Sequence, residues 1–492
     1  MDLAQLKTLK NVTLTVPGIS GLELYPFQRL GVAALQSTPR IILGDFVGLG
    51  KTVQSVAAIQ LLHNTEELSR NDCLVVAPKA VRSDWFKTIK NFTTLTPLIG
   101  DESDKECKYL SRKWNVLILG FPTMRIRIEN LLKTNFKMII IDEGLFRNAE
   151  SQTFIALKRL TDKAQRVVIL NATSMEVSLM EVYSHIEIIC PGLIDLQSFK
   201  DKFCKVETKY FRTIYHTLKT QEKIVGPKSL EAIKELKDFM NKFYLRRTYD
   251  DVSVQLPSKV IKNIRVELLP CQKKEYTEQL KKYKNKEIRG SELCYNLLKI
   301  CDGKLEGFEK EENPEKVSAK GQAFVSYLDS VGKQPVVVYS TYISQLLAFA
   351  KIAKNMGRRI GFFSGENEKT RDQHLEEFKE GKRDVLMLTR AGTRGINLEN
   401  SARLVLVNQL FNSAATTQLI GRISRMTSKH KTIFIDNLLT VDTIEDNVLN
   451  LLEQRGITAD FINEDGTGFK SLTDDQVNKM LRGRKSLIEG LA

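Results

Sequence analysis

One stretch organises the first half of this chain: Gly44-Asp45-Phe46-Val47-Gly48-Leu49-Gly50-Lys51-Thr52. It follows the apolar run Ile41–Leu43 and precedes Val53–Ile59, which has the apolar spacing of a helix. A strand, a glycine-rich turn and a helix form a cradle for phosphate, because backbone N–H groups and the helix N-terminus face the anion. Lys51 would reach the outer phosphates and Thr52 would offer a hydroxyl to Mg²⁺. The stretch predicts binding of ATP with Mg²⁺.

The match to the usual phosphate loop is incomplete. Its common spacing is G-x-x-x-x-G-K-[ST], and Asp45 stands where the first glycine belongs. Gly48 and Gly50 keep the half of the loop that touches phosphate. A flexible surface turn would explain the glycines equally well, so the prediction of nucleotide binding depends on residues further along the chain.

Composition limits the class of protein. With 492 residues the chain is too long for one ordinary core, so two or three domains are expected. No apolar run approaches the roughly 20 residues that span a bilayer, and the N-terminus lacks the pattern of a signal peptide. Seven dispersed cysteines without a C-x-x-C pair favour reduced thiols over a zinc site. We therefore expect a soluble, intracellular protein of the cytoplasm without membrane contact.

The chain is strongly basic. A net charge of +15 favours a polyanionic partner, and together with a phosphate cradle it favours a nucleic-acid-dependent ATPase. General solubility is the alternative explanation of the charge.

Short β-branched runs alternate with helical patterns in both halves, which indicates parallel sheets with helices on both faces. The expected strands of the first half are Arg40–Leu43, Cys73–Ala77, Asn115–Leu119, Met138–Ile141 and Arg166–Leu170. Those of the second half are Val336–Tyr339, Ile360–Phe363, Asp384–Leu388, Arg403–Asn408 and Thr432–Ile435. The fold class is therefore α/β, with two lobes of similar size.

The lobes are expected at residues 1–250 and 251–455, followed by a C-terminal extension at 456–492. Residues 199–250 and 271–316 are rich in Lys and Glu and are expected to be helical insertions. In the second insertion an apolar stripe of Tyr276, Leu280 and Tyr283 lies among lysines, which fits packing on a lobe or contact with DNA. The charged segment Gly303–Lys320 is expected to form a mobile loop.

Two carboxylates follow a buried strand. Asp142 and Glu143 come directly after Met138–Ile141, about ninety residues beyond Lys51. An Asp at a strand end beside a phosphate loop suits Mg²⁺, and the adjacent Glu suits the attacking water of ATP hydrolysis. The pair is common by chance, and its place in an alternating α/β segment strengthens the prediction.

Arginines and glycines near the C-terminus complete the pattern. Arg422 and Arg425 lie three residues apart on one helix face, where an arginine can stabilise charge on the γ-phosphate. Gly392 and Gly395 follow a strand and would let backbone N–H groups approach a phosphate. Surface arginines paired with local acids, and an ordinary turn, are the plainer alternatives.

In this order the motifs resemble the Swi/Snf-type ATPases of helicase superfamily two, over about residues 22–445. The resemblance rests on Leu24–Val32, Asp45–Gln54, Val75–Lys79, Asp142–Gly144, Phe243–Thr248, Thr389–Leu398 and Gln418–Arg425. In that family the loop reads D-x-x-G-L-G-K-T-x-Q, which accounts for Asp45. The resemblance implies two RecA-like lobes, use of ATP and Mg²⁺, and translocation on DNA.

The resemblance also implies roles for matched positions. Gln28 would read adenine, Asp142 and Glu143 would serve Mg²⁺ and water, and Arg425 would be the arginine finger beside Arg422. Further residues would line the nucleotide cleft or touch the nucleic-acid backbone: Gly48, Gly50, Lys51, Thr52, Gly395 and Gln418 for the cleft, and Lys79, Thr123, Ser340, Thr341 and Thr389 for the backbone.

Three positions depart from the family's pattern. Leu145 replaces the His that ends the acidic motif, Asn171–Ser174 replaces T-G-T-P, and Phe46 replaces a Glu of the loop. The first two put the coupling of hydrolysis to movement in doubt. An ATP-driven DNA translocase acting on duplex, forked or four-way-junction DNA is the expected function, with a bacteriophage branch-migration or repair helicase as a guess at its origin. The alternatives are an RNA-directed ATPase or RNA-polymerase-recycling factor, and a nucleic-acid-binding scaffold with an impaired ATPase.

Overall fold

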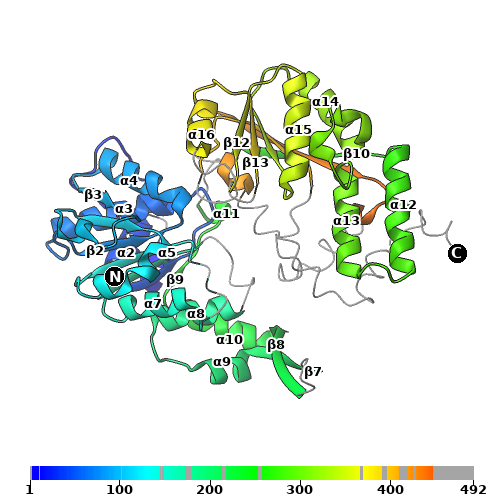
Figure 1. Cartoon of the computed structure of the whole chain (residues 1–492). Helices are drawn as coiled ribbons and strands as arrows, with labels where there is room; N and C mark the ends of the chain where they lie inside the picture. The colour runs from blue at the N-terminus through cyan, green and yellow to red at the C-terminus, as the bar shows by residue number, and fades with distance from the viewer. Residues whose placement is uncertain are drawn as a thin grey trace. The chain divides into compact units, whose positions relative to one another are not determined.

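The structure is a computed structural model and describes residues 3–9, 11–100, 102–144, 146, 149–171, 179–212, 218–252, 257–365, 370–389, 396–408, 419–424 and 428–446. The chain divides into two compact units, Met1–Val254 and Gln255–Ala492. Each unit contains one parallel sheet covered by helices (Figure 1). The predicted α/β class with two mostly parallel sheets is confirmed.

The first unit is built on a seven-stranded sheet whose neighbouring strands all run parallel, in the order β3-β4-β2-β5-β6-β1-β9. The expected strands of this half are all present. Sequence reasoning missed β3 and β9, which are very short. The bounds are β1 Arg40–Leu43, β2 Cys73–Val76, β3 Pro97–Ile99, β4 Val116–Leu119, β5 Met138–Asp142, β6 Arg166–Leu170 and β9 Tyr244–Leu245.

Two apolar cores cover the two faces of this sheet, because successive strand residues point to opposite sides. Helices α1 to α4 pack on one face and α5 to α10 on the other. Their bounds are α1 Leu3–Thr8, α2 Pro26–Ser37, α3 Lys51–Asn64, α4 Lys79–Phe92, α5 Phe121–Ile126, α6 Ile128–Leu131, α7 Gln152–Thr161, α8 Leu179–Ile189, α9 Leu196–Phe203, α10 Leu230–Met240 and α11 Tyr249–Val252, with a 3₁₀ turn η1 at Lys108–Ser111.

The insertion expected to be helical at 199–250 is mixed. Between α9 and α10 it contains an antiparallel hairpin of β7 (Cys204–Arg212) and β8 (Leu218–Pro227), which Figure 1 shows beside α10. The expectation of helix throughout was wrong here. Lys, Glu, Gln and Thr interrupt the apolar residues of both strands, so the sustained alternation that marks a strand is missing from the sequence.

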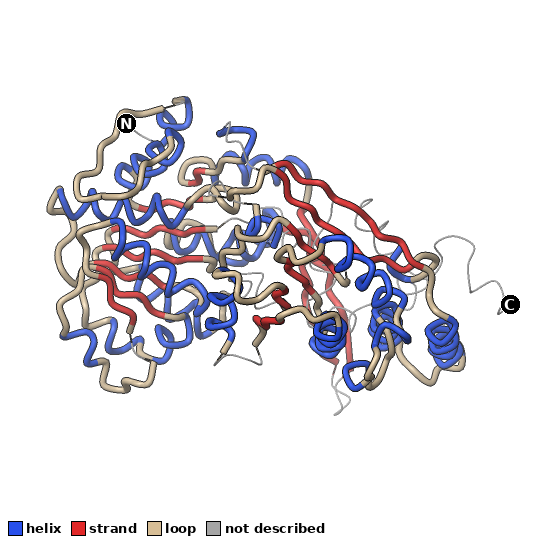
Figure 2. Tube along the Cα trace, turned by 90° about the horizontal axis from the view of Figure 1, so that it is seen from above, coloured by secondary structure: helices blue, strands red, loops and turns tan. Residues whose placement is uncertain are grey.

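The second unit repeats the plan with a six-stranded parallel sheet in the order β10-β15-β14-β11-β13-β12, and Figure 2 shows its strands running side by side. All five expected strands are present, and only the edge strand β10 was missed. Their bounds are β10 Ser258–Val266, β11 Val336–Tyr339, β12 Ile360–Phe363, β13 Val385–Leu388, β14 Arg403–Leu406 and β15 Thr432–Thr440.

The helices of this unit include α14 and α15 on one face of the sheet and α16 on the other. A separate apolar cluster lies between α12 and α13 and contains Tyr276 and Leu280 of the predicted stripe, so this part of the stripe packs inside the unit. The bounds are α12 Pro270–Lys284, α13 Gly290–Asp302, α14 Ala319–Val331, α15 Ile343–Asn355 and α16 Arg371–Lys379.

The segment Gly303–Lys320 is not the mobile loop that its charges suggested. It contains two 3₁₀ turns, η2 (Phe308–Lys310) and η3 (Pro314–Val317), and Phe308 and Lys320 are fully buried. A buried aromatic ring anchors the segment against Phe349 of α15, with ring centroids 6.3 Å apart. The charge of the segment predicted that it would be exposed, but the burial of Phe308 and Lys320 shows that it packs into the unit.

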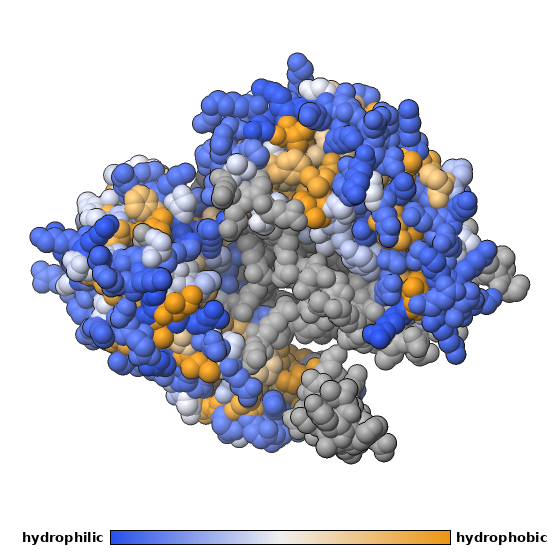
Figure 3. All heavy atoms as spheres, viewed as in Figure 1, coloured by the Kyte–Doolittle hydropathy of each residue, from blue (hydrophilic) through white to orange (hydrophobic). Residues whose placement is uncertain are grey.

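Apolar groups on the molecular face in Figure 3 are scattered among hydrophilic residues. Within the described residues, no helix combines the length and the apolar character that crossing a membrane requires.

Candidate active site

The glycine-rich loop joins β1 to α3 as the sequence predicts. Gly48 and Gly50 have φ of 89° and 76°, the left-handed region that glycine adopts without steric cost. A Cβ on Gly50 would also lie 2.5 Å from the side-chain amide nitrogen of Gln28. The two glycines therefore let the chain turn sharply into α3 while Gln28 approaches the loop.

Lys51 and Gln28 both bind the loop's own carbonyl groups. The Lys51 amine donates to the carbonyl of Asp45 at 2.6 Å, and the Gln28 amide nitrogen donates to that of Leu49 at 3.3 Å. Gln28 is anchored in turn because its Oε1 accepts from the Tyr25 N–H at 3.1 Å. The structure thus brings Gln28, Gly48, Gly50, Lys51 and Thr52 together around one loop.

Asp45 forms a buried ion pair under the loop. Its side chain is fully buried, and Oδ1 accepts from the Nε of Arg247 at 2.9 Å while Oδ2 accepts from a second guanidinium nitrogen. Gln54 of α3 closes the network, donating to Asp45 at 3.0 Å and accepting from Arg247 at 2.8 Å. Asp45 therefore supports the loop from below through the chain that follows β9.

Phe46, a departure from the family's pattern, also contacts this part of the chain. Its ring packs edge-on against that of Tyr249 with centroids 5.0 Å apart, and its N–H donates to the Arg247 carbonyl at 2.9 Å. An aromatic ring at this position thus braces the loop against α11.

The acidic pair lies on the same sheet edge as the loop. Asp142 ends β5 in register with Leu170 of β6, and Leu170 is in register with Leu43 of β1. Two inter-strand spacings, about 10 Å, therefore separate Cα of Asp142 from Cα of Leu43, the residue that precedes the loop. This single row places the carboxylate and the phosphate cradle side by side.

The surroundings of Asp142 and Glu143 fix both side chains. The indole N–H of Trp85, a fully buried residue of α4, donates to Oδ2 of Asp142 at 2.7 Å. Glu143 has φ of 52°, a conformation that costs a non-glycine residue about 1 kcal/mol or more. Its N–H is held by the Leu170 carbonyl at 3.0 Å. The backbone at Glu143 is therefore both strained and held by a hydrogen bond.

The donor set fits Mg²⁺. The described residues contain no group of three or more His, Cys, Asp or Glu side chains that could hold a metal ion. Magnesium binds to proteins through one or two groups and takes its remaining ligands from phosphate and water. The Thr52 hydroxyl and the Asp142 carboxylate are such a pair.

The predicted backbone contacts occupy neighbouring strand ends in each unit. Lys79 and Thr123 follow β2 and β4, which are paired at Val76 and Leu119, and Lys79 is exposed whereas Thr123 is nearly buried. In the second unit Ser340, Thr341 and Thr389 follow the paired strands β11 and β13.

A buried polar network holds Ser340 and Thr341. Asn408 accepts from the Thr341 N–H at 2.8 Å and donates to the Ser340 hydroxyl at 3.0 Å and to Asp302 at 2.6 Å. Asp302 pairs with Lys320 at 2.9 Å, and Lys320 also bonds Glu445 at 2.6 Å. All three charged groups are essentially without solvent exposure. Burial raises the pKa of Asp302 to about 6, and although burial opposes it, the two carboxylates raise the pKa of Lys320.

Lys320→Met is expected to loosen the second unit. It leaves Asp302 and Glu445 buried without their cation, and breaking a buried pair in this way costs about 3–5 kcal/mol. Peptide-resolved hydrogen exchange measures the effect, because two units need not unfold together. Exchange should rise in α14 and β14 and stay unchanged in the first unit. The exposed Lys316→Met is the matched control, and equal exchange in both variants would contradict the role of Lys320.

Several predicted positions cannot be placed. Gly395, Gln418 and Arg425 lie outside the described residues, as do Leu145 and residues 172–174. Arg422 is described: it lies in the helical residues 419–423, is nearly buried, and its carbonyl accepts from the Leu398 N–H at 3.0 Å.

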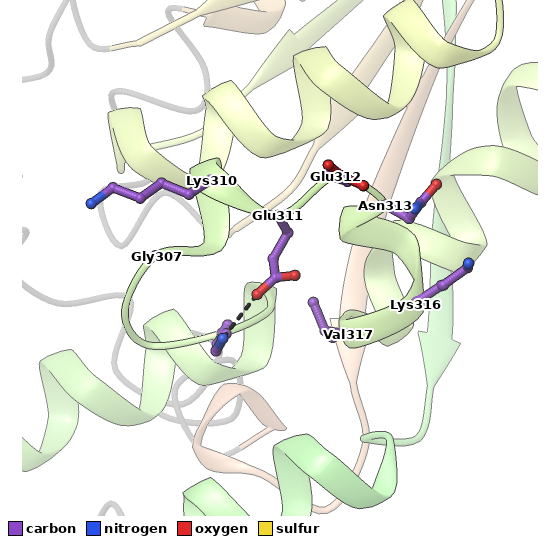
Figure 4. Close-up of a pocket in the computed structure, with 8 residues that line it drawn as sticks. Gly307, Lys310, Glu311, Glu312, Asn313, Lys316 and Val317 are labelled. Atoms are coloured by element: carbon purple, nitrogen blue, oxygen red, sulfur yellow. Dashed lines mark hydrogen bonds and ion pairs between the residues drawn. The ribbon is translucent and has the colours of Figure 1, made fainter.

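A hollow of about 610 Å³ in the second unit contains none of these residues. Two of its lining residues, Lys304 and Glu311, form an ion pair at 2.8 Å. Figure 4 shows the side chains of Lys310 and Lys316 pointing away from Glu311. Exposed lysines beside two glutamates give it no defined ligand chemistry.

Sequence reasoning missed Trp85 and the role of Arg247. A Trp at helical spacing predicts core packing, and only its contact with Asp142 gives it a function. Arg247 was part of a recognised motif, and an Arg-Arg pair beside apolar residues was the available signal that one guanidinium is buried.

Comparison with known proteins gives two family matches. The SNF2-related domain matches residues 28–306, and the helicase conserved C-terminal domain matches residues 319–427. The chain is 25% identical over 461 residues to an uncharacterized ATP-dependent helicase of Mycoplasma genitalium, covering 89% of this chain and 42% of that protein. It is 26% identical over 501 residues to a DNA repair and recombination protein RAD54-like of Danio rerio, covering 89% and 67%. The chain thus spans about two fifths to two thirds of these relatives' lengths.

A solved structure, the Sulfolobus solfataricus SWI2/SNF2 ATPase core in complex with dsDNA, aligns with a TM-score of 0.46 and 21% identity, covering 96% of this chain and 99% of that chain.

Proposed function

The chain belongs to the family of SNF2-related domains, and from this membership we propose that it is an ATP-driven motor that translocates on duplex or branched DNA. The observation that carries the proposal is the row Leu43, Leu170 and Asp142, which sets the acidic pair beside the phosphate loop. A phosphate cradle and a carboxylate pair at one sheet edge are the parts that phosphoryl transfer to water requires.

Each candidate site residue of the first unit is assigned a part in ATP hydrolysis. The loop N–H groups and Lys51 would bind the phosphates. Thr52 and Asp142, whose carboxylate accepts from Trp85, would hold Mg²⁺. Mg²⁺, when bound, neutralises charge that develops on the phosphates. Glu143 orients and polarises the attacking water from its fixed backbone. Arg422 and Arg425 would supply positive charge to the γ-phosphate, with Arg425 as the finger.

DNA is the proposed partner. The charge of +15 suits a polyanion, and the relative from Danio rerio is named for DNA repair and recombination. Hydroxyls and N–H groups at strand ends grip phosphates without reading sequence, which suits a motor that moves along DNA. The finer proposal is work on forks and four-way junctions, including branch migration. The relatives reported above come from cellular organisms and lend no support to a bacteriophage origin.

The deciding experiment measures ATP turnover with duplex DNA, forked DNA, a synthetic four-way junction, single-stranded DNA and RNA at equal nucleotide concentration. We expect duplex or branched DNA to raise turnover at least about tenfold over RNA. Stimulation should fall steeply between about 50 and 200 mM salt, since binding through phosphates releases counterions. A junction-unwinding assay with ATP on the same substrates distinguishes strand separation from translocation alone.

Two outcomes would replace the proposal. Stimulation by RNA equal to or above that by duplex DNA would favour an RNA-directed ATPase or a factor that recycles RNA polymerase. Nucleic-acid binding without any stimulated turnover would favour a scaffold with an impaired ATPase, the alternative that Leu145 and Asn171–Ser174 raise.

A further inference from the structure

A histidine outside the recognised motifs contacts the acidic pair's loop. His185 lies on α8, packed on the opposite sheet face from the phosphate-loop helix α3. Its Nε2 lies 3.2 Å from the carbonyl oxygen of Gly144, the residue that follows Glu143. A carbonyl oxygen only accepts hydrogen bonds, so this ring nitrogen is the donor.

The ring is neutral where it sits. His185 is only 5% exposed, and burial lowers its pKa to about 4. The bond to Gly144 is therefore made by an uncharged Nε2–H, which adds no cation beside the two carboxylates. Removing the donor would leave a buried carbonyl without this partner and free the peptide to rotate.

The bonded carbonyl belongs to the residue that follows Glu143. Glu143 has a positive φ, and its N–H is bonded to Leu170 on one side while the carbonyl of the next residue is bonded to His185 on the other. Gly144 is closely packed, since a Cβ there would lie 2.6 Å from Ile141 and 2.7 Å from the ring of Phe146. Two hydrogen bonds thus hold a strained backbone at the residue that must aim its carboxylate.

We propose that His185 is a positioning residue for ATP hydrolysis: through Gly144 it fixes the backbone that directs Glu143 at the attacking water. The proposal rests on the ATPase activity proposed above. The hydrogen bond of His185 also connects α8, which follows the divergent segment Asn171–Ser174, to the acidic motif. A shift of α8 would be transmitted to the direction of the Glu143 carboxylate.

Three variants test the proposal in steady-state ATP turnover. His185→Leu removes the donor at similar volume, and kcat should fall about tenfold or more while KM for ATP changes less than about twofold, because misaligned catalytic groups slow the chemical step. His185→Gln keeps an N–H at similar reach and should recover at least about half of the lost kcat. Val182→Ala, one turn earlier on α8 and equally buried, should keep wild-type kcat although it removes buried side-chain volume.

Hydrogen exchange gives a second readout. Amide exchange in the segment 142–144 should be faster in His185→Leu than in Val182→Ala, because only the first change removes a hydrogen bond from this segment. Three outcomes would overturn the role of His185 without affecting the proposed function: wild-type kcat in His185→Leu, no recovery of kcat in His185→Gln, or an equal loss of kcat in Val182→Ala. A wild-type protein that turns over no ATP under any condition would overturn the proposed function and this inference with it.

Discussion

Lys51→Ala is expected to reduce DNA-stimulated ATP hydrolysis by about a hundredfold or more, while leaving DNA affinity within about twofold. The Lys51 amine bonds loop carbonyls at 2.6 and 3.5 Å, so it is held at the mouth of the cradle and can exchange these acceptors for phosphate oxygens. Removing one hydrogen-bond donor that is aimed at charge developing in the transition state typically lowers kcat by a factor on the order of 10²–10³. ATPase assays and DNA-binding titrations on the same preparation measure the two quantities.

The control for Lys51 is Lys133→Ala, which removes the same charge from an exposed position just after α6. It should keep wild-type turnover. Glu143→Gln is the companion change: it keeps the side chain's size, removes its charge, and should abolish turnover while ATP still binds. Unchanged turnover in either Lys51→Ala or Glu143→Gln would refute the assignment of the site.

The central strands were predictable because they are buried on both faces. Residues Ile139–Ile141 of β5, for example, are buried on both faces of the sheet, so the sequence there is a continuous run of β-branched residues. The exposed edge strand β10 mixes Val and Ile with Lys, Asn and Arg, and nothing in its own sequence predicts pairing with β15. Its place is set by the partner strand, which a local pattern cannot reveal.

The candidate site shows the same division. Lys51, Thr52, Asp142 and Glu143 were found because their chemistry and their spacing are local to single turns. The contacts that orient them join distant parts of the chain: Trp85 and Asp142 are 57 residues apart, and Asp45 and Arg247 are 202 apart. His185 and Gly144 are 41 apart. Sheet register and the packing of helices on the sheet bring such pairs together, so a local motif predicts candidate reacting groups and misses the groups that hold them.

Arg247→Met is expected to weaken ATP binding about tenfold or more and to destabilise the first unit by about 3–5 kcal/mol, the cost of leaving one member of a buried ion pair alone. Asp45 is fully buried, and without Arg247 its remaining side-chain contact in this network is Gln54 at 3.0 Å. The carbonyl of Asp45 is also the acceptor of Lys51, so movement of Asp45 displaces the phosphate-binding amine. Nucleotide titration and peptide-resolved hydrogen exchange across residues 44–54 measure binding and local stability.

Arg246→Met is the matched control, because Arg246 adjoins Arg247 in sequence but is exposed. It should bind ATP as the wild type does. The double variant Asp45→Asn with Arg247→Met removes both charges, and it should be more stable than Arg247→Met alone, since no unpaired charge remains buried. If the two single changes add without coupling, Asp45 and Arg247 do not act as a pair. If Arg246→Met weakens ATP binding as much as Arg247→Met does, general loss of positive charge, and not support of the loop, explains the effect.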